Sequence, residues 1–198
     1  GRALFYRGSA QPRRGLLPEY GLEGVDRNML VKVIKEILTN KNGWARSTMS
    51  QWVYPKLTTS ELDQLWGDIY RATRHIAPSG IMFASGVRTD GLKLMAEHRV
   101  KEGMYLAAWY IRWQKGHGAP ARVPAALKAL ESYGAYAKPL IPYLKQHVEY
   151  WKSQRGRQQT VDQINATIEK IKASKEKPQL MSIAKYLKKD DYPPKHGP

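Results

Sequence analysis

The sequence predicts an all-α protein: an α-solenoid of about three to four antiparallel helix pairs, with an irregular N-terminal lead-in and a C-terminal capping helix. Apolar residues recur at helical spacing through most of the 198 residues. In 125–148, AALKALESYGAYAKPLIPYLKQHV, two short helices are joined by a tight turn at Gly134, and the second opens at Lys138 and Pro139. Such a pair cannot bury its apolar stripe alone, so it needs neighbours of the same kind.

Residues 1–25 are rich in Gly, Pro and Arg and have no helical period, which predicts an irregular lead-in or a linker. Within it, Phe5 and Tyr6 are expected to pack on the first helix. The repeat domain is predicted over 26–174. Its first helix has an N-cap at Asp26 and reaches about Asn40, with the inward positions Leu30, Val33, Ile34, Ile37 and Leu38.

A shorter second helix is predicted over 44–53. It ends before Tyr54 and Pro55, because a residue that precedes proline disfavours helical backbone angles. Thr58 and Glu61 then fit a capping box. The third helix runs from there to about His75 and carries the apolar stripe Leu62, Leu65, Trp66, Ile69 and Tyr70.

The loop 77–80 contains Pro and Gly. The apolar residues that follow it are predicted to pack against the core and so anchor the loop: Ile81, Met82 and Phe83. The next helix, 86–99, could be capped by Ser85. Its Gly91 would allow close approach to a neighbouring element.

Gly103 is predicted to separate that helix from 104–114, which is apolar almost all round except for Arg112. A helix without a polar face has to be surrounded, so this one should lie deepest. A loop is predicted at 115–120, before the pair 125–148. The last predicted helix has one narrow apolar stripe, formed by Val161, Ile164, Ile168 and Ile171. Its other side is polar, as expected of a capping helix whose outer face meets solvent. The basic tail 175–198 could hold one short docked helix.

Two helix pairs can be aligned with a shift of 35 residues, which places Leu92 and Lys93 on Leu127 and Lys128. A period of that length is typical of paired-helix solenoids. The segment ALKALESYGAYAKPLIPYLKQHV, with its AKPLIPYL run, resembles a HEAT-type repeat. The wider stretch from LLPEYGLEGVDRNML to APSGIMFASGVRTDGLKLMAEHRVKEGM resembles the helical-repeat region of large uncharacterised bacterial proteins, some of which carry a PDZ-like module elsewhere. This resemblance implies a repeat fold and assigns no catalytic residue.

Composition sets further bounds. The formal net charge is +16, from 33 Lys and Arg against 17 Asp and Glu, and the excess is spread along the chain. No apolar run approaches the ~20 residues of a membrane span. The absence of cysteine excludes disulfides and Cys-ligated zinc, and it favours an extracytoplasmic bacterial location only weakly. Because the chain starts at Gly1 without a signal-peptide pattern, we expect a processed product or a piece of a longer protein.

Candidate chemistry is sparse. The sequence has no HExxH, Gly-rich phosphate loop, GxSxG or EF-hand motif, so it predicts no catalytic residue, cofactor or metal ligand. A metal site would need His98 to converge with Asp90, Glu97 or Glu102. The alternative is that Glu97 pairs with Lys93 or Lys101 on a solvated helix face.

The candidate binding residues are basic and fall mostly on the second helices of the predicted pairs: Arg71, Arg74, Arg112, Lys115, Lys145 and Lys152. On the concave side of a solenoid they would form a surface for an acidic partner or for phosphate. Trp109, Tyr110 and Trp113 could serve as a stacking platform for bases or sugars. Three aromatic residues in one apolar helix are, however, more typical of core packing.

The leading hypothesis is a non-enzymatic helical-repeat scaffold or interaction module, a fragment of a larger bacterial protein. Its partner would be another protein or another domain of the same chain. The alternative is a nucleic-acid-binding HEAT-like domain that uses a basic concave face and could have base-processing activity in the manner of the HEAT-like DNA glycosylases. A third hypothesis, a carbohydrate-active accessory domain, requires exposed Trp and Tyr rings.

Overall fold

The computed structural model describes residues 22, 24–112 and 119–193, and this part of the chain folds into α-helices and 3₁₀ turns without a β-strand. The all-α class is therefore confirmed. The chain forms two compact units, residues 1–91 and 92–198, and the boundary falls inside α5 (Ala84–Glu97). Phe5 and Tyr6 lie outside the described residues, and the domain boundaries 1–25, 26–174 and 175–198 stay a prediction. None of the helices described is long and apolar enough to cross a bilayer.

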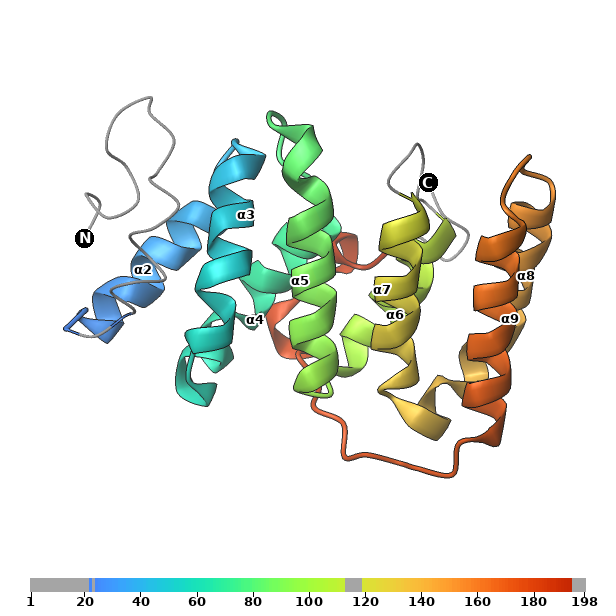
Figure 1. The fold of residues 1–198 in the computed structure, drawn as a ribbon. Helices are drawn as coiled ribbons and strands as arrows, with labels where there is room; N and C mark the ends of the chain where they lie inside the picture. The colour runs from blue at the N-terminus through green and yellow to red at the C-terminus, as the bar shows by residue number, and fades with distance from the viewer. Residues whose placement is uncertain (1–21, 23, 113–118, 194–198) are drawn as a thin grey trace. The chain divides into compact units, whose positions relative to one another are not determined.

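The first unit contains α2 (Arg27–Leu38), α3 (Gly43–Trp52) and α4 (Thr59–Arg74), and α2 packs against both of the others (Figure 1). The predicted apolar stripes are its core, because Ile34, Leu65, Ile69 and Tyr70 have no exposed surface. The 3₁₀ turns η2 (Tyr54–Lys56) and η3 (Ile81–Phe83) follow α3 and precede α5. The three helices of this unit thus lie close to the positions that the sequence predicts.

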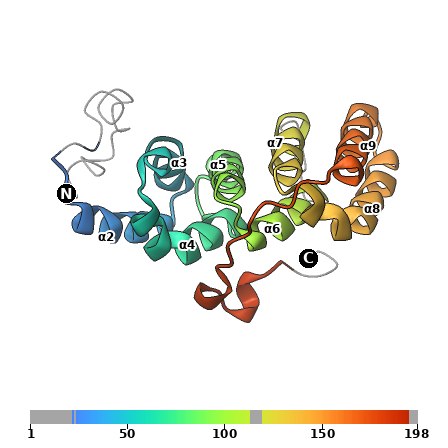
Figure 2. The same ribbon diagram turned by 90° about the horizontal axis from the view of Figure 1, so that it is seen from below.

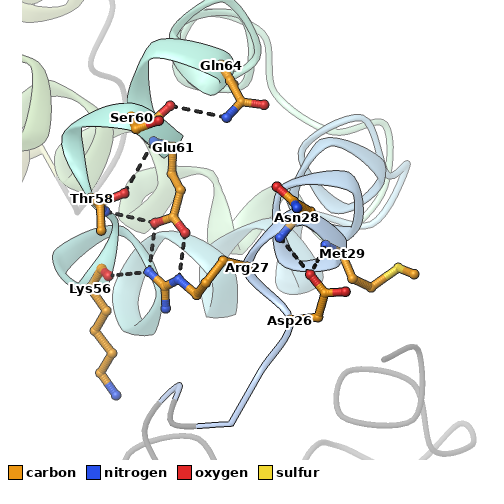
Figure 3. Close-up of polar contacts among 9 residues, drawn as sticks. All are labelled: Asp26, Arg27, Asn28, Met29, Lys56, Thr58, Ser60, Glu61 and Gln64. Atoms are coloured by element: carbon orange, nitrogen blue, oxygen red, sulfur yellow. Dashed lines mark hydrogen bonds and ion pairs between the residues drawn. The ribbon is translucent and has the colours of Figure 1, made fainter.

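The helices α2 and α4 each have an N-terminal cap of their own, and an ion pair between Arg27 and Glu61 joins the starts of the two helices (Figure 3). The Asp26 carboxylate accepts hydrogen bonds from the backbone amides of Asn28 and Met29, at 2.9 and 3.2 Å. The capping box at Thr58 is confirmed, because the Thr58 amide donates to the Glu61 side chain at 2.8 Å and the Glu61 amide to the Thr58 hydroxyl at 3.4 Å. Arg27 then donates from Nε and Nη2 to the two Glu61 oxygens, at 2.6 and 2.7 Å.

Glu61 is only 5 % exposed, yet it remains a carboxylate at neutral pH. Burial pushes its pKa upward, but the hydrogen bonds from Arg27 and Thr58 together lower the pKa below the ordinary value of 4.5. A carboxylate with a depressed pKa stabilises the fold above its unfolded pKa. That contribution is lost as the pH falls through the pKa of the folded state.

Arg27→Met is expected to lower the free energy of unfolding by on the order of 1–3 kcal/mol at neutral pH, because Glu61 would keep a buried charge without its bidentate partner. The difference from the wild type should shrink below pH 4.5 as Glu61 protonates. Urea denaturation across this pH range measures both effects. Lys93→Met, which removes an exposed pair 3.8 Å from Glu97, is the control and should change stability by less than about 0.5 kcal/mol. Equal losses in both variants would contradict the assignment.

The prediction that Ile81, Met82 and Phe83 pack against the core is wrong. Ile81 and Met82 are 63 % and 81 % exposed, and only Phe83 is partly covered. The backbone explains this, because Ser79 pairs with the segment that precedes α3: its amide donates to the Lys41 carbonyl at 3.0 Å, and its own carbonyl accepts from the Gly43 amide at 2.9 Å. The chain then turns at Gly80 with φ +65°, which directs η3 away from the core.

Gly91 lies where α5 crosses α4, and the predicted close approach is confirmed. A Cβ at Gly91 would stand 1.9 Å from the Thr73 hydroxyl oxygen and 3.0 Å from both Thr73 Cβ and Cγ2. Rotating the Thr73 side chain cannot relieve this, because Cβ itself is too close. The hydroxyl is also committed, at 2.8 Å, to the Ile69 carbonyl.

Gly91→Ala should therefore destabilise the protein by about 1–3 kcal/mol through overpacking, despite the higher helix propensity of alanine. Gly86→Ala, in the same helix, is the matched control. Its Cβ would meet only the Ser47 hydroxyl, at 2.9 Å, which can rotate away. Thermal unfolding of the two variants should separate them, and a stable Gly91→Ala protein would refute the packing argument.

The second unit contains α6 (Lys101–Arg112), α7 (Ala119–Glu131), the 3₁₀ segment η4 (Gly134–Leu140), α8 (Ile141–Lys152) and α9 (Gln158–Ala173). Figure 2 shows α6 and α8 in one layer and α7 and α9 in the other, and each helix contacts a helix of the other layer. The prediction for the apolar helix 104–114 is confirmed over its described part. Of residues 102–111, only Tyr105 is exposed. Trp109 and Leu144 are buried as well.

Three predicted boundaries in this unit are wrong. The break before α6 is not at Gly103, which lies inside the helix, but at Arg99, whose φ is +55°. Gly103 is needed for packing instead, because a Cβ there would lie 2.7 Å from Met95 Cβ and 2.9 Å from the Tyr133 hydroxyl. The predicted loop 115–120 is shorter at its end, since α7 already begins at Ala119. Lys138 and Pro139 lie in η4, and α8 starts only at Ile141.

After α9 the chain returns as a largely extended segment, residues 174–193, which we call the C-terminal strap (Figure 1). Its Glu176 carbonyl accepts from the Ala135 amide at 2.8 Å, and its Met181 pairs with the backbone on both sides of Val100. Glu102, at the start of α6, accepts from the Ser182 hydroxyl at 2.7 Å and the Ile183 amide at 3.0 Å. The described part of the predicted basic tail is therefore docked, with two 3₁₀ turns, Ala184–Tyr186 and Lys189–Asp191, where one short helix was expected.

Candidate functional site

The six predicted basic residues fall into separate groups. Arg71 and Arg74 lie on α4 in the first unit, Arg112 on α6 and Lys145 and Lys152 on α8 in the second. Lys115 lies outside the described residues. The single basic face that would join all six stays a prediction.

Arg112 ends α6 and lies against aromatic side chains of α8. Its guanidinium carbon is 5.2 Å from the centre of the Tyr150 ring, a cation–π distance. Burial raises the pKa of Tyr143, and the positive charge of Arg112 opposes this shift. Tyr143 makes an edge-on contact with His147, with ring centres 4.3 Å apart. We call Arg112, Tyr143, His147 and Tyr150 the Arg112 cluster.

His147 links the two helices of this layer and has no exposed surface. Its Nε2 lies 2.8 Å from the Ala108 carbonyl oxygen, so Nε2 carries the hydrogen and donates it. Burial lowers the pKa of His147 to about 4, the Ala108 bond opposes this shift, and the charge of Arg112 adds to it. The imidazole is therefore neutral at physiological pH, and its role is to join α6 to α8.

Lys145 and Lys152 lie on a different flank of α8. They are offset by two positions from Tyr143 and Tyr150, and two residues turn an α-helix by about 200°. Both lysines are exposed, and Lys152 Nζ lies 2.9 Å from the Glu149 carboxylate. The structure thus brings Arg112 together with tyrosines, and it places the two lysines on the opposite side of the same helix.

On α4, the two predicted arginines have structural contacts. Arg71 Nη2 lies 2.9 Å from the Asp68 carboxylate in the same helix. Arg74 is partly buried, which lowers its pKa, and the nearby positive charge of Arg88 lowers it further. Arg88 donates from Nη2 to the Arg74 carbonyl at 3.2 Å, so two arginines lie side by side at the ends of α4 and α5.

The carboxylates considered for a metal site have other contacts. Asp90 accepts from the Ser50 hydroxyl at 2.8 Å, Glu97 pairs with Lys93 at 3.8 Å, and Glu102 holds the C-terminal strap. Within residues 22, 24–112 and 119–193, no group of three His, Asp or Glu is close enough to hold a metal ion. Asp90 and Glu102 therefore accept hydrogen bonds from neighbouring segments, and Glu97 forms a solvent-exposed ion pair.

The aromatic platform is wrong for the two rings that the structure describes. Trp109 is 5 % exposed and Tyr110 3 % exposed, so neither ring offers a face to a base or a sugar. Trp113 lies outside the described residues. The carbohydrate-binding hypothesis loses its support in these rings.

Sequence reasoning missed the Arg112 cluster and the exposed residues of the loop before α5. Tyr143, His147 and Tyr150 are spaced by four and three residues, so they share one side of α8, and that spacing was a usable signal. No comparable signal marks Ile81 and Met82, because their exposure follows from tertiary pairing at Ser79.

The comparisons with known proteins add no relative: no protein-family model, no curated protein and no solved structure matches this chain. The HEAT-like assignment therefore remains a prediction.

The low pKa of His147 predicts a pH dependence of stability. Since the pKa is about 4 in the fold and 6.5 in the unfolded chain, the unfolded state binds more protons between these values. Stability should fall as the pH drops from 6.5 to 4, by on the order of 3 kcal/mol from this group. His147→Gln should show a smaller slope in denaturation experiments over this range, whereas His98→Gln, which changes an exposed histidine, should retain the wild-type slope. Identical slopes in all three proteins would refute the prediction.

Proposed function

We propose that this chain is a HEAT-like α-solenoid that acts as a non-enzymatic interaction module, a part of a larger bacterial protein. The observation that carries the proposal is the packing of the second unit in two helical layers (Figure 2). Within one layer, α6 and α8 run parallel, because Ala108 meets His147 and Arg112 meets Tyr150 further along both helices. Parallel second helices in one layer are expected of stacked helix pairs.

The charge of the second unit indicates the chemistry of the partner. Residues 92–198 contain 20 Lys and Arg against 9 Asp and Glu, a larger excess than in residues 1–91. On α8, Lys145 and Lys152 are exposed and two helical turns apart, so they point the same way. An acidic segment of another protein, or of another domain, would meet complementary charge on this flank.

The test compares two double charge reversals of equal net charge. Lys145→Glu with Lys152→Glu changes the α8 flank, and Lys172→Glu with Lys175→Glu changes the end of α9 and the start of the C-terminal strap. The sets are matched because Lys172 pairs with Glu169 at 2.6 Å, as Lys152 does with Glu149. With a fluorescent Asp- and Glu-rich peptide, the α8 variant should bind at least about tenfold more weakly than the wild type, and the α9 variant within about threefold of it.

Equal losses in both variants, or no peptide binding at low salt, would refute the α8 surface. The same proteins are titrated with duplex DNA to test the alternative. A DNA affinity that falls by orders of magnitude between about 50 and 200 mM salt would favour the nucleic-acid-binding function instead.

A further inference from the structure

The loop between α4 and α5 exposes an unusual amount of apolar surface. Ile76, Ile81 and Met82 are 43 %, 63 % and 81 % exposed. Within the part of the chain that the structure describes, seven large hydrophobic residues are exposed, and these three lie within seven consecutive positions. We call residues 75–83 the Ile81 loop. Clustered apolar exposure of this kind marks an interaction site more often than scattered exposure does.

The loop is held firmly at its base. In addition to the Ser79 backbone pairing, the Ser79 hydroxyl donates to the Lys41 carbonyl at 2.8 Å. Arg46, which is 9 % exposed, donates to the Asn40 carbonyl at 2.8 Å and to the His75 carbonyl at 2.9 Å. A Cβ at Gly43 would lie 2.5 Å from the Gly80 carbonyl oxygen, so the two segments are in close contact. The exposure of Ile81 and Met82 is therefore built into the backbone of this unit.

The charge around the loop is positive. Residues 69–89 contain three arginines and neither Asp nor Glu; Arg71 pairs with Asp68, which leaves Arg74 and Arg88 as the arginines nearest the loop. Arg74 and Arg88 are in contact beside the loop, and Lys41 is exposed on the segment that pairs with Ser79. The loop thus combines protruding aliphatic side chains with basic neighbours.

We propose that the Ile81 loop inserts Ile76, Ile81 and Met82 into the surface of an anionic phospholipid bilayer, while the neighbouring basic side chains contact the headgroups. Aliphatic side chains that stand out from a surface enter acyl chains readily, and basic residues at the same level are attracted to anionic lipid. A second copy of the chain is disfavoured, because it would bring positive charge to positive charge. Nucleic acid would match the charge but not the aliphatic side chains, which cannot stack on bases.

The absence of cysteine makes a direct test simple. Met82→Cys in the full chain is labelled with an environment-sensitive fluorophore and mixed with vesicles. Vesicles of equimolar phosphatidylcholine and phosphatidylglycerol should shift the emission to the blue, and vesicles of phosphatidylcholine should not. Met29→Cys is the matched control, because Met29 is also exposed, at 47 %, but lies at the start of α2. Its emission should not change.

Sedimentation with the same anionic vesicles measures the contribution of the apolar side chains. Ile81→Ser with Met82→Ser should reduce the partition coefficient by on the order of tenfold or more, whereas Met29→Ser should leave it unchanged. Because these positions are exposed, the variants should unfold at the wild-type temperature. A lowered unfolding temperature would reveal a misfolded variant. Binding that survives Ile81→Ser with Met82→Ser would show attraction by charge without insertion and overturn the proposal. A blue shift with an acidic peptide in place of vesicles would overturn it as well.

Discussion

The second unit depends on one constraint: α6 has almost no polar face and has to be enclosed. Its residues 102–111 are buried except for Tyr105, so neighbours must cover nearly the whole circumference. The helix α7 covers one side, α8 another, and the C-terminal strap crosses the start of the helix. Gly103 makes this enclosure close, because the Met95 and Tyr133 side chains occupy the space that a Cβ would need.

Polar groups inside this enclosure fix the relative positions of its parts. The Tyr133 hydroxyl donates to the Val100 carbonyl at 2.9 Å, and Arg99 reaches the Ser132 carbonyl, so the end of α7 is joined to the turn before α6. His147 joins α8 to Ala108, and Glu102 joins the strap to α6. A buried polar group without a partner is costly, so each of these bonds selects one register among several that apolar packing would tolerate.

Most of the helices could be predicted from the sequence, because their stripes and caps are local. Asp26, Thr58 and Glu61 act as predicted, and so do the apolar stripes of α2, α4 and α9. The turn before α6 could not be predicted, since Arg99 adopts a positive φ that few arginines adopt, and its contacts come from α7 and the strap. Within the candidate site, Arg112 was named from the sequence as a candidate binding residue. Its aromatic partners on α8 could not be predicted, because they depend on how α6 and α8 pack.

In the first unit, polar hydrogen bonds also fix the position of a segment, but at the Ile81 loop they keep apolar side chains exposed instead of enclosing them. Hydrophobicity predicts that Ile81 and Met82 are buried, but backbone hydrogen bonds at Ser79 and the buried guanidinium of Arg46 hold the loop where these side chains meet solvent. Retracting the loop to bury them would break those bonds and leave Arg46 without its carbonyl acceptors, and a buried guanidinium without acceptors is strongly unfavourable. The fold therefore keeps an apolar surface exposed that it cannot bury in its own core without breaking these hydrogen bonds. Only contact with another molecule or surface would remove these side chains from water.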